Sequence, residues 1–364
     1  MTYTVLPRPG IMDISPYVAG ESKISGSQQI IKLSSNEGAF GPSPKAIDAL
    51  QNATKTMHRY PDANAGTLRQ AIADQYGLDR ERIVCGAGSD EIISLLCFAY
   101  AGPGDEVLYS QYGFLMYPIS AKAAGATPVK ALETNMKTDV DALLKAVTEK
   151  TRIVFVANPN NPTGTYISSA EMARLRQGLP DKVLLVIDAA YAEFVDQGDY
   201  TPGVEIVNSG QNTVMTRTFS KMFGLGGLRV GWGYCPREIA DVLNRVRGPF
   251  NVSCAAQTAA IASLGDHEFQ EKSVKHTLKW IAKTQAALQN LGLTTTQSVA
   301  NFVMVQFKDS DTAEACDLYL RTQGIIVRRI NSYNLPQALR ISIGTDSEME
   351  AMLSAIKDFM KSQS

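Results

Sequence analysis

The chain alternates short, mainly apolar runs with longer stretches in which apolar residues recur at helical spacing. The short runs are clearest at residues 106–109, 153–157 and 183–187, and helical patterns at residues 118–124 and 140–148 lie between them. Apolar runs without polar alternation predict strands that are covered on both faces, as in a parallel sheet. The spacing of the elements is typical of repeated strand–helix–strand units.

The pattern changes after about residue 245. A long helix is predicted at residues 267–291, strands at 302–305, 325–328 and 339–343, and a last helix at 346–361. Helices over a small sheet indicate a separate α+β domain. We therefore expect an α/β protein whose large domain has a mostly parallel central sheet flanked by helices. The expected division is an N-terminal arm at residues 1–32 that is part of the small domain, a large domain at 33–250 and a small domain at 251–364.

Composition excludes several classes of function. The 364 residues suit two domains, and a formal net charge of −1 gives no field that attracts nucleic acid or an anionic membrane. Five scattered cysteines without C-x-x-C spacing indicate reduced thiols. Residues 1–9 lack the pattern of a signal peptide and no long apolar run occurs, so we expect a cytoplasmic protein. Three histidines without H-E-x-x-H predict no metal site.

Residues 218–231 contain the first candidate chemistry. Lys221 follows the hydroxyl residues Thr218 and Ser220, and a glycine-rich run after it ends at Arg229. Hydroxyl groups and an arginine fork suit a phosphate. A lysine beside that phosphate could be a point charge, or the amine that forms a Schiff base with pyridoxal phosphate. A plain turn with a surface lysine remains the alternative.

A second small-residue loop, residues 86–91, lies between a short strand and an apolar helix and contains Ser89 and Asp90. This arrangement can aim free backbone N–H groups at an anion. The loop matches neither the Walker pattern nor the dinucleotide-binding pattern. A tight strand-to-helix turn is the alternative interpretation.

Three polar residues follow predicted strands. Asp188 ends the most apolar strand, Tyr191 lies three residues further on, and Asn161 follows the neighbouring strand. Ligands of parallel sheets bind at the carboxyl ends of strands. A partly buried carboxylate needs a partner, and a pyridinium N–H is suitable, whereas Asn161 and Tyr191 could donate to a phenolic oxygen. Asp188 as the N-cap of a following helix is the alternative.

Together these segments carry a resemblance that covers nearly the whole chain. Residues 161–164 (Asn-Pro-Thr-Gly), Asp188 with Tyr191, Ser220 with Lys221, and Gly231 resemble, in order and spacing, the fold type I, class I/II pyridoxal-phosphate aminotransferases. Four further segments resemble the histidinol-phosphate aminotransferase branch of that family, namely residues 33–37, 41–44, 59–62 and 339–345.

The resemblance implies roles for individual residues. Lys221 matches the Schiff-base lysine, Asp188 the partner of the pyridine nitrogen, and Asn161 and Tyr191 the contacts to the ring hydroxyl. The residues that match the phosphate site are Ser89, Asp90, Thr218, Ser220 and Arg229. Tyr112 matches an aromatic residue that stacks on the cofactor.

Outside the cofactor site, the resemblance implies a homodimer, because Tyr60 matches a tyrosine that reaches the phosphate in the partner subunit's site. Arg340 matches the arginine that grips the substrate's anionic group, and Tyr17 and Arg328 fall near positions that line the substrate pocket. The family usually has Asn-Glu-Asn-Pro-Leu-Gly-Pro where this chain has Gly-Ala-Phe at residues 38–40. That change near the expected substrate entrance predicts a reshaped pocket.

The implied reaction exchanges an amino group between histidinol phosphate and 2-oxoglutarate, giving imidazole acetol phosphate and glutamate in histidine biosynthesis. An aminotransferase for tyrosine or phenylalanine is one alternative. A phosphothreonine-type decarboxylase is another, because the sequence does not reveal which bond at Cα is broken. A non-catalytic, DNA-binding relative is disfavoured, since the N-terminal arm has neither a helix-turn-helix pattern nor a basic patch.

Overall fold

The computed structural model describes residues 5–24, 30–210 and 212–363. These residues form a seven-stranded sheet in the order β2-β10-β9-β8-β7-β3-β4. Its strands are β2 (Ile83–Gly86), β3 (Glu106–Ser110), β4 (Thr127–Ala131), β7 (Thr151–Ala157), β8 (Leu184–Asp188), β9 (Thr213–Thr218) and β10 (Gly231–Tyr234). Strands β3, β4, β7, β8 and β9 pair in parallel, and β10 runs antiparallel to both β9 and β2.

The central strands are apolar on both faces because helices cover both faces of the sheet. Along β7, Ile153 and Phe155 share a core with α3 (Ser89–Tyr100), α4 (Met116–Ala124) and α8 (Arg237–Val246). The alternate residues Val154 and Val156 pack instead with α5 (Val140–Ala146), α6 (Ser169–Gly178) and α7 (Val204–Ser209). Successive strand residues point to opposite faces, so this arrangement requires the unbroken apolar run that predicted the strand.

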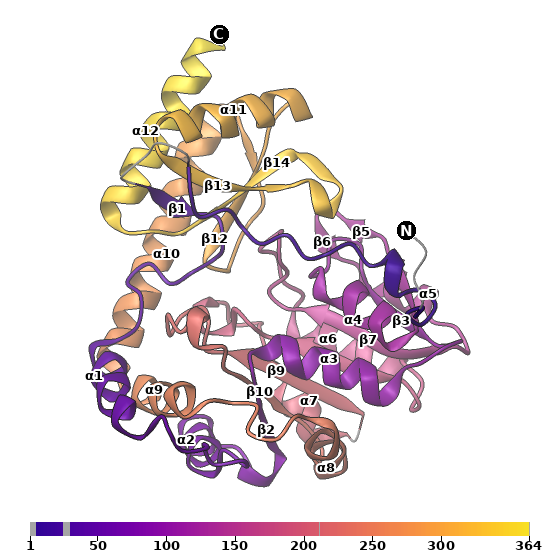
Figure 1. Cartoon of the computed structure of the whole chain (residues 1–364). Helices are drawn as coiled ribbons and strands as arrows, with labels where there is room; N and C mark the ends of the chain where they lie inside the picture. Colours follow the sequence, from indigo (N-terminus) through magenta and orange to yellow (C-terminus); the bar gives the residue numbers. More distant parts are fainter. Residues whose placement is uncertain (1–4, 25–29, 211, 364) are drawn as a thin grey trace.

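A five-stranded sheet forms the second core, in the order β1-β13-β14-β12-β11. Its elements are β1 (Ile31–Leu33), β11 (Thr294–Thr295), β12 (Phe302–Gln306), β13 (Ile325–Ile330) and β14 (Leu335–Ser342), with α10 (His267–Asn290), α11 (Ser310–Thr322) and α12 (Asp346–Ser362). Strand β1 pairs in parallel with β13. The indigo N-terminal segment therefore crosses from the side of α4 to the small sheet (Figure 1).

The expected fold class is confirmed, as a large domain on a mostly parallel sheet and a smaller α+β domain. Helix α9 (Cys254–Leu264) packs against α1 (Pro44–Ala53) and α2 (Gly66–Tyr76), in the same core as Met215 and Trp232 of the large sheet. Helix α9, which the predicted division assigns to the small domain, thus shares a core with the large sheet. The division into domains stays a prediction.

Some elements had no clear sequence pattern. Strand β4 lies at the edge of the large sheet and is mostly half-exposed, and the hairpin of β5 (Glu133–Thr134) and β6 (Lys137–Thr138) is very short. Helix α3 begins at Ser89, three residues before the predicted apolar stretch, because its first turn is polar. No described helix is long and apolar enough to cross a membrane.

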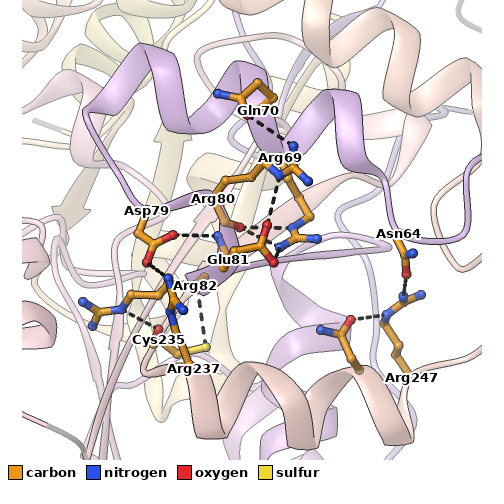
Figure 2. A network of polar contacts seen from close by, with 11 residues as sticks. Asn64, Arg69, Gln70, Asp79, Arg80, Glu81, Arg82, Cys235, Arg237 and Arg247 are labelled. Atoms are coloured by element: carbon orange, nitrogen blue, oxygen red, sulfur yellow. Dashed lines mark hydrogen bonds and ion pairs between the residues drawn. The ribbon is translucent and has the colours of Figure 1, made fainter.

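A polar network fastens the start of β2 to the rest of the large domain (Figure 2). Asp79 caps the turn at Arg80–Arg82 by accepting from the Glu81 N–H at 2.9 Å, and it also accepts from Arg237 at 2.9 Å. The Arg82 guanidinium donates to the carbonyls of Cys235 at 3.0 Å and Val207 at 2.8 Å. One half-buried arginine therefore joins β2, the end of β10 and α7.

We expect Arg82→Ala to lower the free energy of unfolding by about 2–3 kcal/mol, because it leaves two main-chain carbonyls without their charged donor. The matched control is Arg80→Ala, which removes an exposed arginine two residues away, and we expect it to change stability by less than about 0.5 kcal/mol. Urea unfolding of both variants measures the difference. Equal effects would show that Arg82 acts no differently from a surface arginine.

Candidate active site

A cavity of about 430 Å³ lies at the carboxyl ends of the parallel strands. Ala157 ends β7, Asp188 ends β8 and Thr218 ends β9, and all three line it. The small domain closes the other side with Arg328 of β13 and Arg340 of β14. The cavity thus occupies the edge of the sheet at which ligands of such folds bind.

Asp188 is buried at the floor of the cavity, with 4% of its surface exposed. Its carboxylate accepts from the Tyr117 hydroxyl at 2.8 Å and from Thr216 Oγ1 at 3.2 Å. Burial raises the pKa of Asp188 to about 6, although both hydrogen bonds act in the opposite direction. A cationic ring N–H placed in the cavity would give this carboxylate the partner that burial demands.

Asn161 and Tyr191 are also buried in the cavity wall. Arg340 Nη1 donates to Asn161 Oδ1 at 2.6 Å, which leaves the Asn161 amide NH₂ to donate elsewhere. Asn36 Nδ2 donates to the Tyr191 hydroxyl at 3.0 Å. Burial raises the pKa of Tyr191 to about 12, so Tyr191 keeps its proton at neutral pH.

Lys221 extends into the same cavity from the loop after β9. Its Nζ lies 5.7 Å from the centre of the Tyr191 ring and 3.4 Å from the Ser35 carbonyl oxygen. The pKa of Lys221 is lowered to about 8, first by removal from water and then by the positive charge of Arg340. Arg229 also lowers the pKa of Lys221, but it contributes less than Arg340. A neutral amine is therefore accessible near neutral pH.

The five residues expected to hold a phosphate lie together at one end of the cavity. Ser89 begins helix α3, so the positive end of the helix dipole faces this region. Arg229 donates to Asp90 at 2.9 Å and to Ser220 Oγ at 3.3 Å, and Thr218 Oγ1 donates to Ser220 Oγ at 3.0 Å. Hydroxyl groups, a guanidinium and a helix N-terminus suit a phosphate dianion.

Glycine is required at two positions behind this group. A Cβ at Gly88, whose φ is +86°, would collide with the Arg229 guanidinium. A Cβ at Gly231 would collide with the backbone nitrogen of Ser89. The glycines of both predicted loops thus allow the start of α3 and Arg229 to meet.

Arg340 is the one site residue whose guanidinium joins the two domains. It is 6% exposed, and its Nη2 donates to the Ser34 carbonyl at 3.0 Å. Its Nε has no hydrogen-bond partner among the described residues. An unpartnered, buried cationic N–H beside a cavity fits an anionic ligand.

The other two expected substrate residues differ in their surroundings. Tyr17 is half-exposed and lines the cavity from the N-terminal arm. Arg328 also lines it, but both of its terminal nitrogens donate to the arm, to the Ala19 carbonyl at 2.7 Å and the Val18 carbonyl at 2.6 Å. Arg328 therefore holds the arm over the cavity in this structure.

Three of the residues that the sequence analysis associated with the site lie outside the lining of the cavity. Tyr112 packs beside the small cluster around Met304, and Tyr60 is 82% exposed and stacks on Phe250. Phe40 contacts α10 instead, with 4.6 Å between its ring centre and that of His276. The Phe40 ring is thus turned toward α10, and the expectation that the Gly-Ala-Phe segment reshapes the pocket stays a prediction.

Sequence reasoning missed several partners of the site residues. Tyr117 and Thr216 bind Asp188, and Ser342 and Asn36 form hydrogen bonds with one another. Tyr117 lies in α4 but one residue before the predicted helical pattern at 118–124, and nothing in the sequence indicates the role of its hydroxyl. Asn36 lies in residues 33–37, one of the segments that resemble the family, and this resemblance is the feature that could have identified it.

The residues present fit pyridoxal phosphate. A carboxylate at the floor, two ring-side donors, a lysine with a lowered pKa and a phosphate-binding end occupy one cavity of sufficient size. The roles of the individual residues remain predictions, since geometry alone supports them.

Comparisons with known proteins agree with this geometry. A family model described as aminotransferase class I and II matches residues 28–356. A histidinol-phosphate aminotransferase of Paramagnetospirillum magneticum is 57% identical, covering 97% of this chain and 98% of that protein. One from a Ruegeria species is 53% identical, covering 98% of each.

Solved structures are similar as well. A Sinorhizobium meliloti histidinol-phosphate aminotransferase in complex with pyridoxal 5'-phosphate has a TM-score of 0.92 at 27% identity, covering 99% of this chain and 100% of that one. An L-threonine-O-3-phosphate decarboxylase of Porphyromonas gingivalis, at 21% identity and a TM-score of 0.78, shares the fold. The chain belongs to the class I and II aminotransferases.

Proposed function

We propose that this enzyme transfers an amino group between histidinol phosphate and 2-oxoglutarate, yielding imidazole acetol phosphate and glutamate, and that pyridoxal 5'-phosphate is its cofactor. Identity above 50% over nearly the full length of several relatives of that name supports the substrate. The observation that carries the proposal is the convergence of Lys221, Asp188 and a buried Arg340 on one cavity. These three residues would supply an amine, a ring partner and an anion site within reach of one another.

The bound cofactor would supply an aldehyde that takes the lysine amine and a ring that accepts electrons from the substrate carbon. Once the amino group of the substrate has taken the place of the lysine on the aldehyde, the freed Lys221 amine would hold or move the proton at that carbon, which its lowered pKa favours. Asp188 keeps a proton on the ring nitrogen through its negative charge. Asn161 and Tyr191 hold the ring hydroxyl, and the Arg229 end of the cavity holds the phosphate.

We assign Arg340 to the anionic group of both substrates, the phosphate of one and the carboxylate of the other. Its unpartnered Nε supports this role. Arg328 would add a second positive charge for the phosphate, in exchange for its contacts with the arm. One shared anion site suits a reaction whose two substrates enter in turn.

We further propose a cytoplasmic homodimer. Tyr60 and Phe250 form an exposed aromatic stack, with ring centres 4.5 Å apart, on the large domain. Exposed aromatic pairs are unfavourable in water and are enriched at protein interfaces. In the dimer Tyr60 would reach the phosphate end of the partner's cavity.

The central test is Lys221→Ala, with Lys45→Ala at an exposed lysine of α1 as the matched control. We expect Lys221→Ala to lose the visible absorption of the lysine-bound cofactor and to lower kcat by at least about 10³-fold, since general acid–base catalysis alone contributes 10²–10⁴. Lys45→Ala should behave as wild type. Glutamate formation from histidinol phosphate and 2-oxoglutarate measures turnover. Near-wild-type turnover of Lys221→Ala would contradict the assignment.

The same assay on wild type separates the alternatives. We expect glutamate to form with histidinol phosphate at a far higher kcat/KM than with tyrosine or phenylalanine. Release of carbon dioxide without glutamate would instead identify a decarboxylase.

Arg340→Ala should raise KM for both histidinol phosphate and glutamate by about 10- to 100-fold, because hydrogen bonds to charged groups contribute roughly 1.5–3 kcal/mol. Arg328→Ala, the control on the adjacent strand, should raise KM for histidinol phosphate and leave that for glutamate nearly unchanged. Steady-state kinetics in both directions measure this. An Arg340→Ala effect on one substrate alone would show that the anion site is not shared.

The raised pKa of Asp188 predicts that the stability of the cofactor-free protein depends on pH. Its pKa is raised from 3.8 to about 6, so the folded state binds the proton more tightly and stability falls as pH rises between about 4 and 6. Asp188→Asn removes this penalty. We therefore expect the variant to gain about 2–2.5 kcal/mol relative to wild type between pH 4 and pH 7, because the carboxyl of the unfolded chain is already partly ionised at pH 4.

Urea unfolding of both cofactor-free proteins across that range measures the difference. Thr284→Val, which alters a buried hydroxyl group that lies outside the cavity lining and has no hydrogen-bond partner among the described residues, serves as a pH-independent control. If the stability difference between Asp188→Asn and wild type is the same at every pH, the pKa of Asp188 is not raised by folding.

A further inference from the structure

The hydroxyl group of Tyr191 has a fixed donor on one side. Asn36 Nδ2 donates to Tyr191 Oη at 3.0 Å, in a buried position. An amide nitrogen can donate and cannot accept, so the hydrogen of the tyrosine hydroxyl takes no part in this contact. That hydrogen remains for an acceptor elsewhere, and Tyr191 lines the cavity.

The orientation of the Asn36 amide is itself determined by Ser342 of β14. The main-chain N–H of Asn36 donates to Ser342 Oγ at 2.7 Å. Ser342 can therefore use its own hydrogen to donate to Asn36 Oδ1, at 3.2 Å. Because a main-chain N–H is always a donor, it sets the direction of every hydrogen bond that follows, up to the hydroxyl of Tyr191.

The backbone at Asn36 is held in place independently of this chain of hydrogen bonds. Its φ of 54° is left-handed, a conformation that asparagine and aspartate tolerate better than most residues. Asn301 Nδ2 donates to the carbonyls of Asn36 at 3.0 Å and Glu37 at 3.3 Å. The side chain of Asn36 is thus directed at Tyr191 by contacts that do not involve the cavity.

We propose that Asn36, oriented by Ser342, is a positioning residue that makes Tyr191 a hydrogen-bond donor to the phenolic oxygen of the cofactor. This inference rests on the proposed function of the cavity. A donor at that oxygen stabilises its ionised form. The Asn36–Tyr191 contact therefore influences the charge state of the cofactor ring through the tyrosine hydroxyl, although Asn36 also lines the cavity.

Other charged and titratable groups also face Tyr191. Arg340, Asp188 and Tyr17 influence its pKa, and the Lys221 amine lies 5.7 Å from the centre of its ring. Their charges act on the cofactor whether or not Tyr191 donates. An experiment must therefore separate the direction of one hydrogen bond from the surrounding charge.

Asn36→Asp reverses that direction, because a carboxylate accepts from the tyrosine hydroxyl and draws its hydrogen away from the cavity. The variant keeps the size of the side chain and tolerates the left-handed backbone. In the holoenzyme, we expect the pKa of the visible absorption of the lysine-bound cofactor to rise by about one unit. Tyr191→Phe should give a similar rise. An unchanged spectral pKa in Asn36→Asp would overturn the proposal.

A double-mutant cycle separates hydrogen-bond direction from charge. If Asn36 acts through Tyr191, adding Asn36→Asp to Tyr191→Phe gives no further rise in the spectral pKa. A further rise equal to that of the single variant would show that the new carboxylate acts directly by its charge, and would overturn the proposal.

Ser342→Ala provides a second variant should Asn36→Asp not fold. Without Ser342 the amide loses its fixed orientation, so a smaller rise is expected, again absent in the Tyr191→Phe background. Asn301→Ala is the matched control, since it loosens the same loop and leaves the chain of hydrogen bonds to Tyr191 intact. If the spectral pKa rises as much in Asn301→Ala as in Ser342→Ala, the effect comes from a loosened loop and not from the orientation of Asn36, and the proposal is overturned. Absence of visible absorption in wild type would instead overturn the proposed cofactor site.

Discussion

The buried guanidinium of Arg340 is the interaction on which the site depends. It lies on a strand of the small sheet, yet it donates to Asn161 in the loop after β7 of the large sheet. It also donates to the Ser34 carbonyl next to β1. A charged group without water must find such partners, so Arg340 fixes how the two domains meet around the cavity. Its charge in turn lowers the pKa of Lys221.

Burial disfavours the charged forms of several groups in the cavity. Asp188 has a raised pKa, Lys221 a lowered one, and Arg340 keeps one N–H without a partner among the described residues. Each of these three groups would gain a partner from a different part of the proposed ligands. Asp188 would face the ring nitrogen, Lys221 the aldehyde and Arg340 the anionic group of the substrate. The folded chain holds this unfavourable arrangement because large apolar cores on both faces of the sheet stabilise it.

The sequence predicts most of this arrangement, for identifiable physical reasons. The central strands are visible because burial on both faces demands unbroken apolar runs, and Asp188 and Asn161 are visible because polar residues at strand ends interrupt them. Edge strand β4 escapes prediction because it is half-exposed. The positions of Phe40 and Arg328 escape it as well, since their contacts with α10 and with the N-terminal arm depend on tertiary packing.

Strand β14 combines two functions that the sequence gives no reason to connect. Arg340 and Ser342 are two residues apart, so their side chains lie on the same face of the strand. The first faces the proposed anion site, and the second orients Asn36 and, through it, the hydroxyl of Tyr191. Both side chains belong to one rigid strand, so a displacement of β14 would change the contacts of Arg340 and of Ser342 together. The proposed roles of these residues would therefore link substrate recognition in the small domain to the charge state of the cofactor ring in the large domain.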